Sequence, residues 1–291
     1  MYSGIFTALL TPFTSSGEVN TSAIKDLVEF NIEKGVDGLY LCGGTGEGFL
    51  LSEQERKLVT ETAVKAVNGR IPVITHVGAI TTAQAVNLAE HAMNNGASAV
   101  ASTPPIYYYV GNEGVLKYYH QLAEAAKSPV FFYNVPASAG TSLTAEMAAS
   151  FYEEGILQGI KYTSSDMLTL HMIMEACKGK ITVFSGPDEM FLPYLTMGIS
   201  GGIGATFNFL ADTFVDIYSA YKSGNVEQAQ LQQNKVNQTI GVFINYGVIP
   251  AVKSSMSFLG IDCGNPREPL VALNEEQKKN LELDLKHINL L

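Results

Sequence analysis

The segment Gly155-Ile-Leu-Gln-Gly-Ile-Lys-Tyr-Thr-Ser-Ser-Asp166 decides how the rest of the chain is interpreted. Its apolar part, Ile156 to Ile160, is typical of a buried strand, and a helical pattern follows at once with Ser165 or Asp166 as its N-cap. Lys161 lies at the carboxyl end of this strand. A lysine is unusual in a core, but an amine nucleophile has to be kept from water so that it can react in its neutral form. Lys161 is therefore the first candidate for a catalytic residue.

The same alternation of strand and helix extends on both sides of Lys161. Short apolar runs predict strands at residues 5–7, 38–42, 71–75, 98–102, 129–133, 156–160, 181–184 and 201–204. Helical patterns follow them at residues 24–32, from Ser52, from Thr81, at 113–126, and from Thr144, Asp166, Asp188 and Leu210, with capping-box sequences at Ser52–Glu55 and Thr81–Gln84. Alternating strands and helices indicate a parallel sheet, and eight units indicate an α/β fold of the closed (β/α)8 TIM-barrel type.

The last part of the chain has only helical patterns. They cover residues 226–246, 249–259 and 275–288. We therefore expect a barrel over residues 1–223 and a C-terminal helical subdomain over residues 224–291. An open doubly wound sheet is the alternative fold, but the glycine-rich segment near Gly43 is not the dinucleotide fingerprint.

Composition excludes several classes of partner. The net charge is −10 and there is no Lys/Arg cluster, so a nucleic-acid partner is not expected. No apolar run approaches the roughly 20 residues of a membrane span, and the N-terminus lacks a secretory signal, so we expect a cytoplasmic protein without membrane contact. The cysteines Cys42, Cys177 and Cys263 are far apart and fit neither a metal site nor structural disulfides.

Unusual residues lie where the predicted strands end, which is where barrel enzymes place their chemistry. The second strand leads into Gly43-Gly-Thr-Gly-Glu-Gly48, whose backbone amides could approach an anion closely, with the Thr45 hydroxyl as a further donor. A plain loop that needs positive φ is an equal alternative. Tyr133 ends the fifth strand, and its phenol could relay protons or be a satisfied core hydroxyl.

Other strand ends carry residues with two readings each. The segment Tyr107-Tyr-Tyr109 suits a subunit interface as well as a site. His76 is interpreted as structural, because a metal-dependent mechanism would need several clustered ligands. Asp188 and Glu189 could cap the helix that follows or hydrogen-bond a polyol, with Glu189 the stronger candidate for binding.

Three of these motifs together give the chain a family resemblance. Gly43-x-x-Gly46-Glu47, Tyr133-Asn-Val-Pro136 and Gly159-Ile-Lys161 resemble the pyruvate-dependent aldolases of the dihydrodipicolinate synthase / N-acetylneuraminate lyase superfamily. The match runs through all eight predicted barrel units and into the C-terminal helices. It implies that Lys161 forms a Schiff base with a keto acid, without cofactor or metal.

The resemblance also implies roles for the remaining residues. Tyr133 would shuttle a proton to and from the aldol hydroxyl, and Thr45 with the amides around Gly44 would hold the pyruvate carboxylate. Tyr107 would reach a neighbouring subunit's site, which implies a homotetramer built as a dimer of dimers. The family usually has two hydroxyl residues in the turn, whereas this chain has Gly44 at the first position.

Further features resemble the branch that cleaves sialic acid to N-acetylmannosamine and pyruvate. They are His76-Val-Gly78, Gly186-x-Asp188-Glu189 as a pocket for the polyol tail with Thr163 facing it, and Gly201-Gly-Ile-Gly-Ala-Thr-Phe-Asn208. The synthase branch usually has an arginine where this chain has Ser138. The lyases often have a serine where it has Ala205.

Two alternatives stay open. The chain could be another 2-keto-3-deoxy sugar-acid aldolase or a dihydrodipicolinate synthase. It could also be a barrel that binds a sugar acid as a sensor without catalysis, although a pure binder has no need of Lys161, Tyr133 and Thr45 together.

Overall fold

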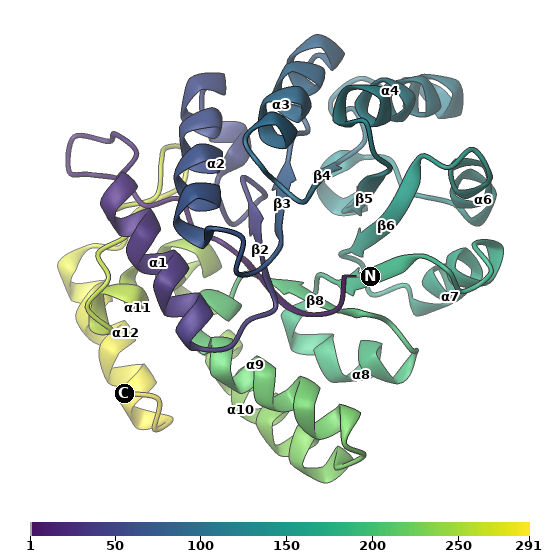
Figure 1. Ribbon diagram of the computed structural model, residues 1–291. Helices are drawn as coiled ribbons and strands as arrows, with labels where there is room; N and C mark the ends of the chain where they lie inside the picture. Colours follow the sequence, from purple (N-terminus) through teal and green to yellow (C-terminus); the bar gives the residue numbers. More distant parts are fainter. Residues whose placement is uncertain (1) are drawn as a thin grey trace.

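Eight parallel strands close into a barrel, each paired with its neighbours in chain order, in a computed structural model that describes residues 2–291 (Figure 1). The predicted (β/α)8 fold is confirmed. The strands are β1 (Gly4–Ala8), β2 (Gly38–Leu41), β3 (Val73–His76), β4 (Ala99–Ser102), β5 (Val130–Asn134), β6 (Leu157–Tyr162), β7 (Thr182–Ser185) and β8 (Gly201–Gly204).

Helices surround these strands, and the last three gather on one side of the barrel (Figure 1). The barrel helices are α1 (Thr21–Glu33), α2 (Glu53–Val67), α3 (Thr82–Asn94), α4 (Gly111–Ala126), α5 (Pro136–Ala139), α6 (Ala145–Glu153), α7 (Met167–Ala176), α8 (Phe191–Thr196) and α9 (Phe207–Lys222), with short 3-10 turns η1 (Gly48–Leu50) and η2 (Asp188–Met190). The chain continues with α10 (Val226–Tyr246), α11 (Val248–Phe258) and α12 (Glu275–His287).

Side-chain caps start the helices where the sequence predicts them. Ser52 and Glu55 form the reciprocal capping box of α2, and Asp166 rather than Ser165 caps α7 by accepting from the Thr169 amide. Thr81 caps α3 by accepting from the amide three residues on, but the return bond of a capping box is absent. The Thr81 box was therefore only half right.

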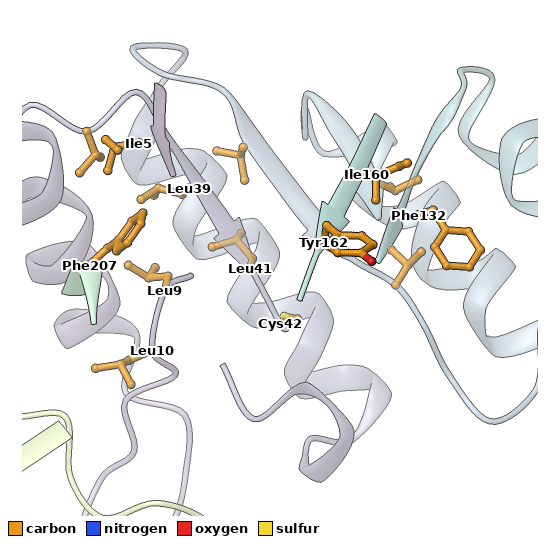
Figure 2. Close-up of a cluster of buried hydrophobic side chains, with 14 of the residues drawn as sticks. Ile5, Leu9, Leu10, Leu39, Leu41, Cys42, Phe132, Ile160, Tyr162 and Phe207 are labelled. Atoms are coloured by element: carbon orange, nitrogen blue, oxygen red, sulfur yellow. The ribbon is translucent and has the colours of Figure 1, made fainter. Parts of the chain in front are cut away.

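Two hydrophobic layers follow from the alternation of side chains along each strand. The barrel interior holds Phe6, Ala8, Tyr40, Ile74, Ala99, Ala101, Phe131, Tyr133, Phe184 and Ile203. The outer layer packs against the helices, and Figure 2 shows part of it, with Leu39 and Leu41 on β2 and Ile160 and Tyr162 on β6. Because Ile160 and Tyr162 face outward, the residue between them faces the interior.

Strand β6 is longer than predicted. It continues past Ile160 to Tyr162, since Lys161 pairs in register with Tyr133 on β5 and with Phe184 on β7. The candidate nucleophile therefore lies within the sheet and not after it, and the two neighbouring strands hold its backbone on both sides.

Two helical segments also differ from the sequence prediction. Helix α9 begins at Phe207, and the predicted start, Leu210, is a kink with φ −114° and ψ 27° inside it. A short helix that the sequence did not indicate, α5, follows β5, with Pro136 at its first turn where a missing N–H costs nothing.

The C-terminal helices share the outer core of the barrel. Helix α10 packs along α9, and Val236, Phe243, Leu281 and Leu285 belong to the same buried cluster as the barrel's outer layer. A division of the chain at residue 223 remains a proposal. None of the helices within residues 2–291 combines the length and apolar character that a membrane span requires.

Candidate active site

Lys161 is buried inside the barrel mouth. Only 5% of the residue is exposed. Its Nζ lies 4.7 Å from the ring centroid of Tyr40 and 4.4 Å from that of Tyr133. Among residues 2–291 no carboxylate lies within 4.0 Å of this nitrogen. Buried lysines are normally paired, so a buried amine that faces two aromatic rings without an ion-pair partner is a candidate for chemistry.

Two tyrosines flank this amine, and the sequence pointed to only one of them. Tyr133 on β5 was predicted, and its ring stands edge-on to those of Tyr40 and His76, at 6.1 and 5.9 Å between centroids. Tyr40 on β2 was missed. The alternation of side chains along β2 could have revealed it: Leu39 and Leu41 face the helices, so the residue between them must face the barrel interior.

The turn after β2 presents free backbone amides beside this cluster. Within residues 2–291 the amides of Gly44 and Thr45 donate to no protein group, whereas Glu47 and Gly48 donate back across the turn to Gly44 and Gly43. Gly44 is exposed and Thr45 half-buried. Free amides next to one hydroxyl suit a carboxylate.

The glycines of this turn do not have positive φ angles, so the alternative that they serve a plain loop needing positive φ is wrong. The positive φ angles belong to Cys42 and Glu47, at 55° each. The glycines provide close approach instead: a Cβ on Gly48 would lie 1.9 Å from the Cys42 carbonyl oxygen, and one on Gly43 would lie 2.6 Å from a ring carbon of Tyr40. Cys42, predicted to lie on a strand, directly follows β2 and is a buried free thiol.

His76 is structural, as predicted. Its Nε2 accepts from the Thr103 amide at 3.2 Å, so its Nδ1 carries the proton and donates to the Cys42 carbonyl at 3.1 Å. Burial lowers the pKa of this histidine well below its ordinary range, with the positive charge of Arg56 as the next cause. The ring is a neutral wall of the site. No group of three metal-ligating side chains occurs within residues 2–291.

A cavity of about 400 Å³ opens beside the ends of β6, β7 and β8. Its lining includes every residue predicted for the polyol pocket, namely Thr163, Gly186, Asp188, Glu189 and Ala205, and adds Thr206, Ile240 and Val248 among others. Ile240 and Val248 come from α10 and α11, so the C-terminal helices form part of the cavity wall. The sequence did not predict this contribution, because it pointed only to residues at strand ends.

Thr163 presents a buried hydroxyl oxygen without a partner among the described residues. A Cβ on Gly186 would lie 1.8 Å from this oxygen, so glycine at 186 is what leaves room for it. An unpaired buried hydroxyl costs free energy unless a ligand completes it.

Asp188 does not cap its own helix, which corrects one of its two predicted roles, and its contact with a polyol stays a prediction. Its Oδ2 accepts from the Thr206 amide at 2.8 Å and from the Thr206 hydroxyl at 2.7 Å instead. Burial raises the pKa of Asp188 to about 6, against these hydrogen bonds. The exposed Glu189 is left as the carboxylate that faces solvent at the cavity.

Tyr107 does not join this cluster within one chain. The residue is 88% exposed, has φ 76°, and its ring packs against Tyr108 at 4.9 Å. Tyr107, Tyr108 and Tyr109 form one exposed aromatic patch before α4.

The chain as a whole matches one family profile. The profile described as the Dihydrodipicolinate synthetase family covers residues 1–288. The chain belongs to the dihydrodipicolinate synthetase family.

Relatives within the dihydrodipicolinate synthetase family carry two different names. An N-acetylneuraminate lyase of Rhizobium meliloti (strain 1021) is 37% identical over 272 residues, which cover 94% of this chain and 90% of that protein. A 4-hydroxy-tetrahydrodipicolinate synthase of Methanopyrus kandleri is 35% identical over 291 residues, 99% and 97% of the two chains. The solved structure of the Proteus mirabilis N-acetylneuraminate lyase has a TM-score of 0.94 and 31% identity, covering 100% of this chain and 99% of that one.

These relationships make the chain an aldolase of the dihydrodipicolinate synthetase family, which unites pyruvate-dependent aldolases. Because the relatives carry two different names, the family alone does not identify the second substrate.

Proposed function

We propose that this chain is a Schiff-base aldolase that cleaves N-acetylneuraminate reversibly to N-acetylmannosamine and pyruvate. The observation that carries the mechanism is the buried Lys161 amine, which has no carboxylate partner among the described residues and faces the interior between two tyrosine rings. A buried lysine held this way is suited to attack a carbonyl group.

The proposed reaction starts when Lys161 Nζ attacks the 2-oxo carbon of the open-chain sugar acid. The carbinolamine oxygen takes up the phenol proton of Tyr133 and leaves as water, and an iminium forms. The resulting Tyr133 phenolate accepts the proton of the C4 hydroxyl, the C3–C4 bond breaks, and its electron pair enters the iminium to give an enamine. Protonation at C3 and hydrolysis release pyruvate and the free lysine. The amides of Gly44 and Thr45 hold the substrate carboxylate throughout, by position rather than by net charge.

The cavity favours a polyol as the second part of the substrate. Its lining contains two carboxylates, Asp188 and Glu189, and neither lysine nor arginine. Such a pocket would repel a second substrate carboxylate and would accept hydrogen bonds from sugar hydroxyls. The exposed Ser138 adds no positive charge either, which argues against a synthase that must bind a dicarboxylic product.

Ala205 offers the substrate no hydroxyl group, whereas the lyases often have a serine at this position. Another 2-keto-3-deoxy sugar acid is therefore the second candidate, supported by this one position. The pocket would hold its polyol tail in the same way.

We also propose a homotetramer in which Tyr107 of one subunit completes the site of its partner. The exposed patch of Tyr107, Tyr108 and Tyr109 supports this assignment, because three adjacent exposed aromatic residues are typical of an interface.

A substrate panel tests the function directly. Pyruvate release should be fastest from N-acetylneuraminate when it is compared with ketodeoxygluconate, and pyruvate should not be consumed with aspartate semialdehyde. Faster release from ketodeoxygluconate would select the second candidate. Binding without any pyruvate release would select the sensor.

Glu189→Ala separates tail binding from Schiff-base chemistry. Loss of one charged hydrogen-bond partner should raise the KM for N-acetylneuraminate about tenfold and leave pyruvate trapping by borohydride unchanged. Glu146→Ala removes another exposed carboxylate, in the first turn of α6, and is the matched control. Equal loss of both activities in Glu189→Ala would contradict its role in tail binding.

A further inference from the structure

Tyr40 is a buried aromatic residue that touches the candidate nucleophile without a role in the mechanism above. It is 1% exposed, and its ring lies under Lys161 Nζ at 4.7 Å from the centroid. The Tyr133 ring meets the same nitrogen at 4.4 Å, and the two rings stand at 81° to each other. One nitrogen atom therefore faces two aromatic surfaces.

The same ring also supports the carboxylate-binding turn. Any Cβ at position 43 would lie 2.6 Å from Cε1 of Tyr40, so the ring packs directly beneath Gly43. Tyr40 is thus wedged between the amine and the turn, and its position fixes the gap in which a 2-oxo acid would have to lie.

The hydroxyl group of Tyr40 does not explain this placement. It is buried and has no hydrogen-bond partner among residues 2–291. Burial raises the pKa of this phenol well above its ordinary value, so it stays neutral and protonated. An unpaired hydroxyl costs stability, and the ring is the part of the side chain that makes the contacts.

The nitrogen of the Schiff base is Nζ of Lys161, so the positive charge of the iminium forms next to the rings of Tyr40 and Tyr133. A neutral carbinolamine takes up one proton, its C–O bond breaks, water leaves, and a C=N bond carrying a positive charge remains. The faces of aromatic rings attract such a cation, more so where water is excluded.

We propose that Tyr40 is a positioning residue whose ring face, together with that of Tyr133, stabilises the iminium on Lys161 in place of a carboxylate. This inference rests on the proposed Schiff-base function. A carboxylate in the same place would hold the lysine as an ammonium ion and block attack, whereas ring faces bind the cation more weakly and leave the free amine accessible.

Borohydride trapping with pyruvate tests the inference, because borohydride reduces the iminium and not the carbinolamine. In Tyr40→Leu the pyruvate concentration for half-maximal trapping at Lys161 should rise about tenfold. Tyr40→Phe keeps the ring and should trap within about twofold of the natural protein.

Two further proteins control for folding. Phe214→Leu removes a fully buried ring from the cluster with Phe191 and Phe207, away from Lys161, and should lower the melting temperature without changing the trapping curve. If Tyr40→Leu does not fold, Tyr40→Phe with a fully fluorinated ring keeps the shape while removing the negative ring face, and should show the same weakened trapping.

Each outcome has a separate meaning. No trapped adduct in the natural protein would overturn the proposed function itself. Normal trapping in both the natural protein and the ring-deficient variants would overturn the role of Tyr40 alone. Equal loss in Tyr40→Phe and Tyr40→Leu would also overturn it, because the hydroxyl would then be the active group.

Discussion

Two buried lysines in this chain have opposite surroundings. Lys253 on α11 is 1% exposed, and its Nζ lies 2.5 Å from Oε1 of Glu47, which is also buried. Lys161 on β6 is nearly as buried, but it faces the rings of Tyr40 and Tyr133 and forms no ion pair within residues 2–291. The difference separates a lysine that holds structure from a lysine that is available for reaction: the first has a counter-charge and the second does not.

The paired lysine, Lys253, still contributes to the site indirectly, through its partner Glu47. Glu47 belongs to the turn that begins at Gly43, and its Oε2 accepts from the Arg267 amide at 2.6 Å. Lys253 also donates to the Asn265 carbonyl at 3.3 Å. The ion pair therefore ties the turn after β2 to α11 and to the segment that follows α11. Burial lowers the pKa of Lys253, and the Glu47 carboxylate opposes that shift.

Removing the unpaired lysine should have the largest effect on activity. Lys161→Ala should lower turnover by at least about 10⁴-fold, because no other group can form the iminium. The melting temperature should stay close to that of the natural protein, since no ion pair is broken. Turnover assays and thermal melts check both parts. A turnover of Lys161→Ala within a hundredfold of the natural protein would contradict the distinction between the two lysines, because Lys161 would then be structural like Lys253.

Removing the paired lysine should act on stability instead. Lys253→Met leaves Glu47 buried and uncompensated, which should cost roughly 3–5 kcal/mol of unfolding free energy. Denaturant unfolding measures this loss. The double change Glu47→Gln with Lys253→Met should recover at least half of it, since no lone charge remains buried. A Lys253→Met protein of unchanged stability would mean that the ion pair contributes nothing.

The smallest expected effect concerns Asp188, the carboxylate that feels Lys161 at longer range. Its pKa of about 6 lies above the ordinary 3.8, so the folded protein binds this proton more tightly than the unfolded chain. Stability from this group is therefore present at low pH and is lost as the pH rises through about 6. Between about pH 5 and about pH 7 the loss should be about 1 kcal/mol.

Asp188→Asn should remove this pH dependence. Unfolding free energies of the two proteins at both pH values give the difference. Parallel pH profiles would show that Asp188 titrates normally. The same carboxylate should bind sugar hydroxyls best when ionised, so the KM for N-acetylneuraminate should increase below about pH 6 in the natural protein.

Much of the site could be predicted because its residues stand at strand ends, which periodicity reveals. Lys161, Tyr133, Thr45, Asp188 and Glu189 were predicted in this way, whereas Thr163, Gly186 and Ala205 were predicted only from the family resemblance. Tyr40 was missed because its neighbours Leu39 and Leu41 made β2 read as a uniformly apolar strand. The Thr206 partner of Asp188 was missed because it belongs to a different strand–helix unit.

The sequence by itself determined the barrel, since strand and helix periods are local properties that each segment displays on its own. It also placed a lysine near the carboxyl end of the sixth strand, which the structure extends by two residues beyond Ile160. Only the tertiary structure decided which lysine has a counter-charge, because Glu47 meets Lys253 and Tyr40 meets Lys161 through closure of the barrel and packing of α11. Those contacts depend on strand register and helix docking, which no local pattern encodes.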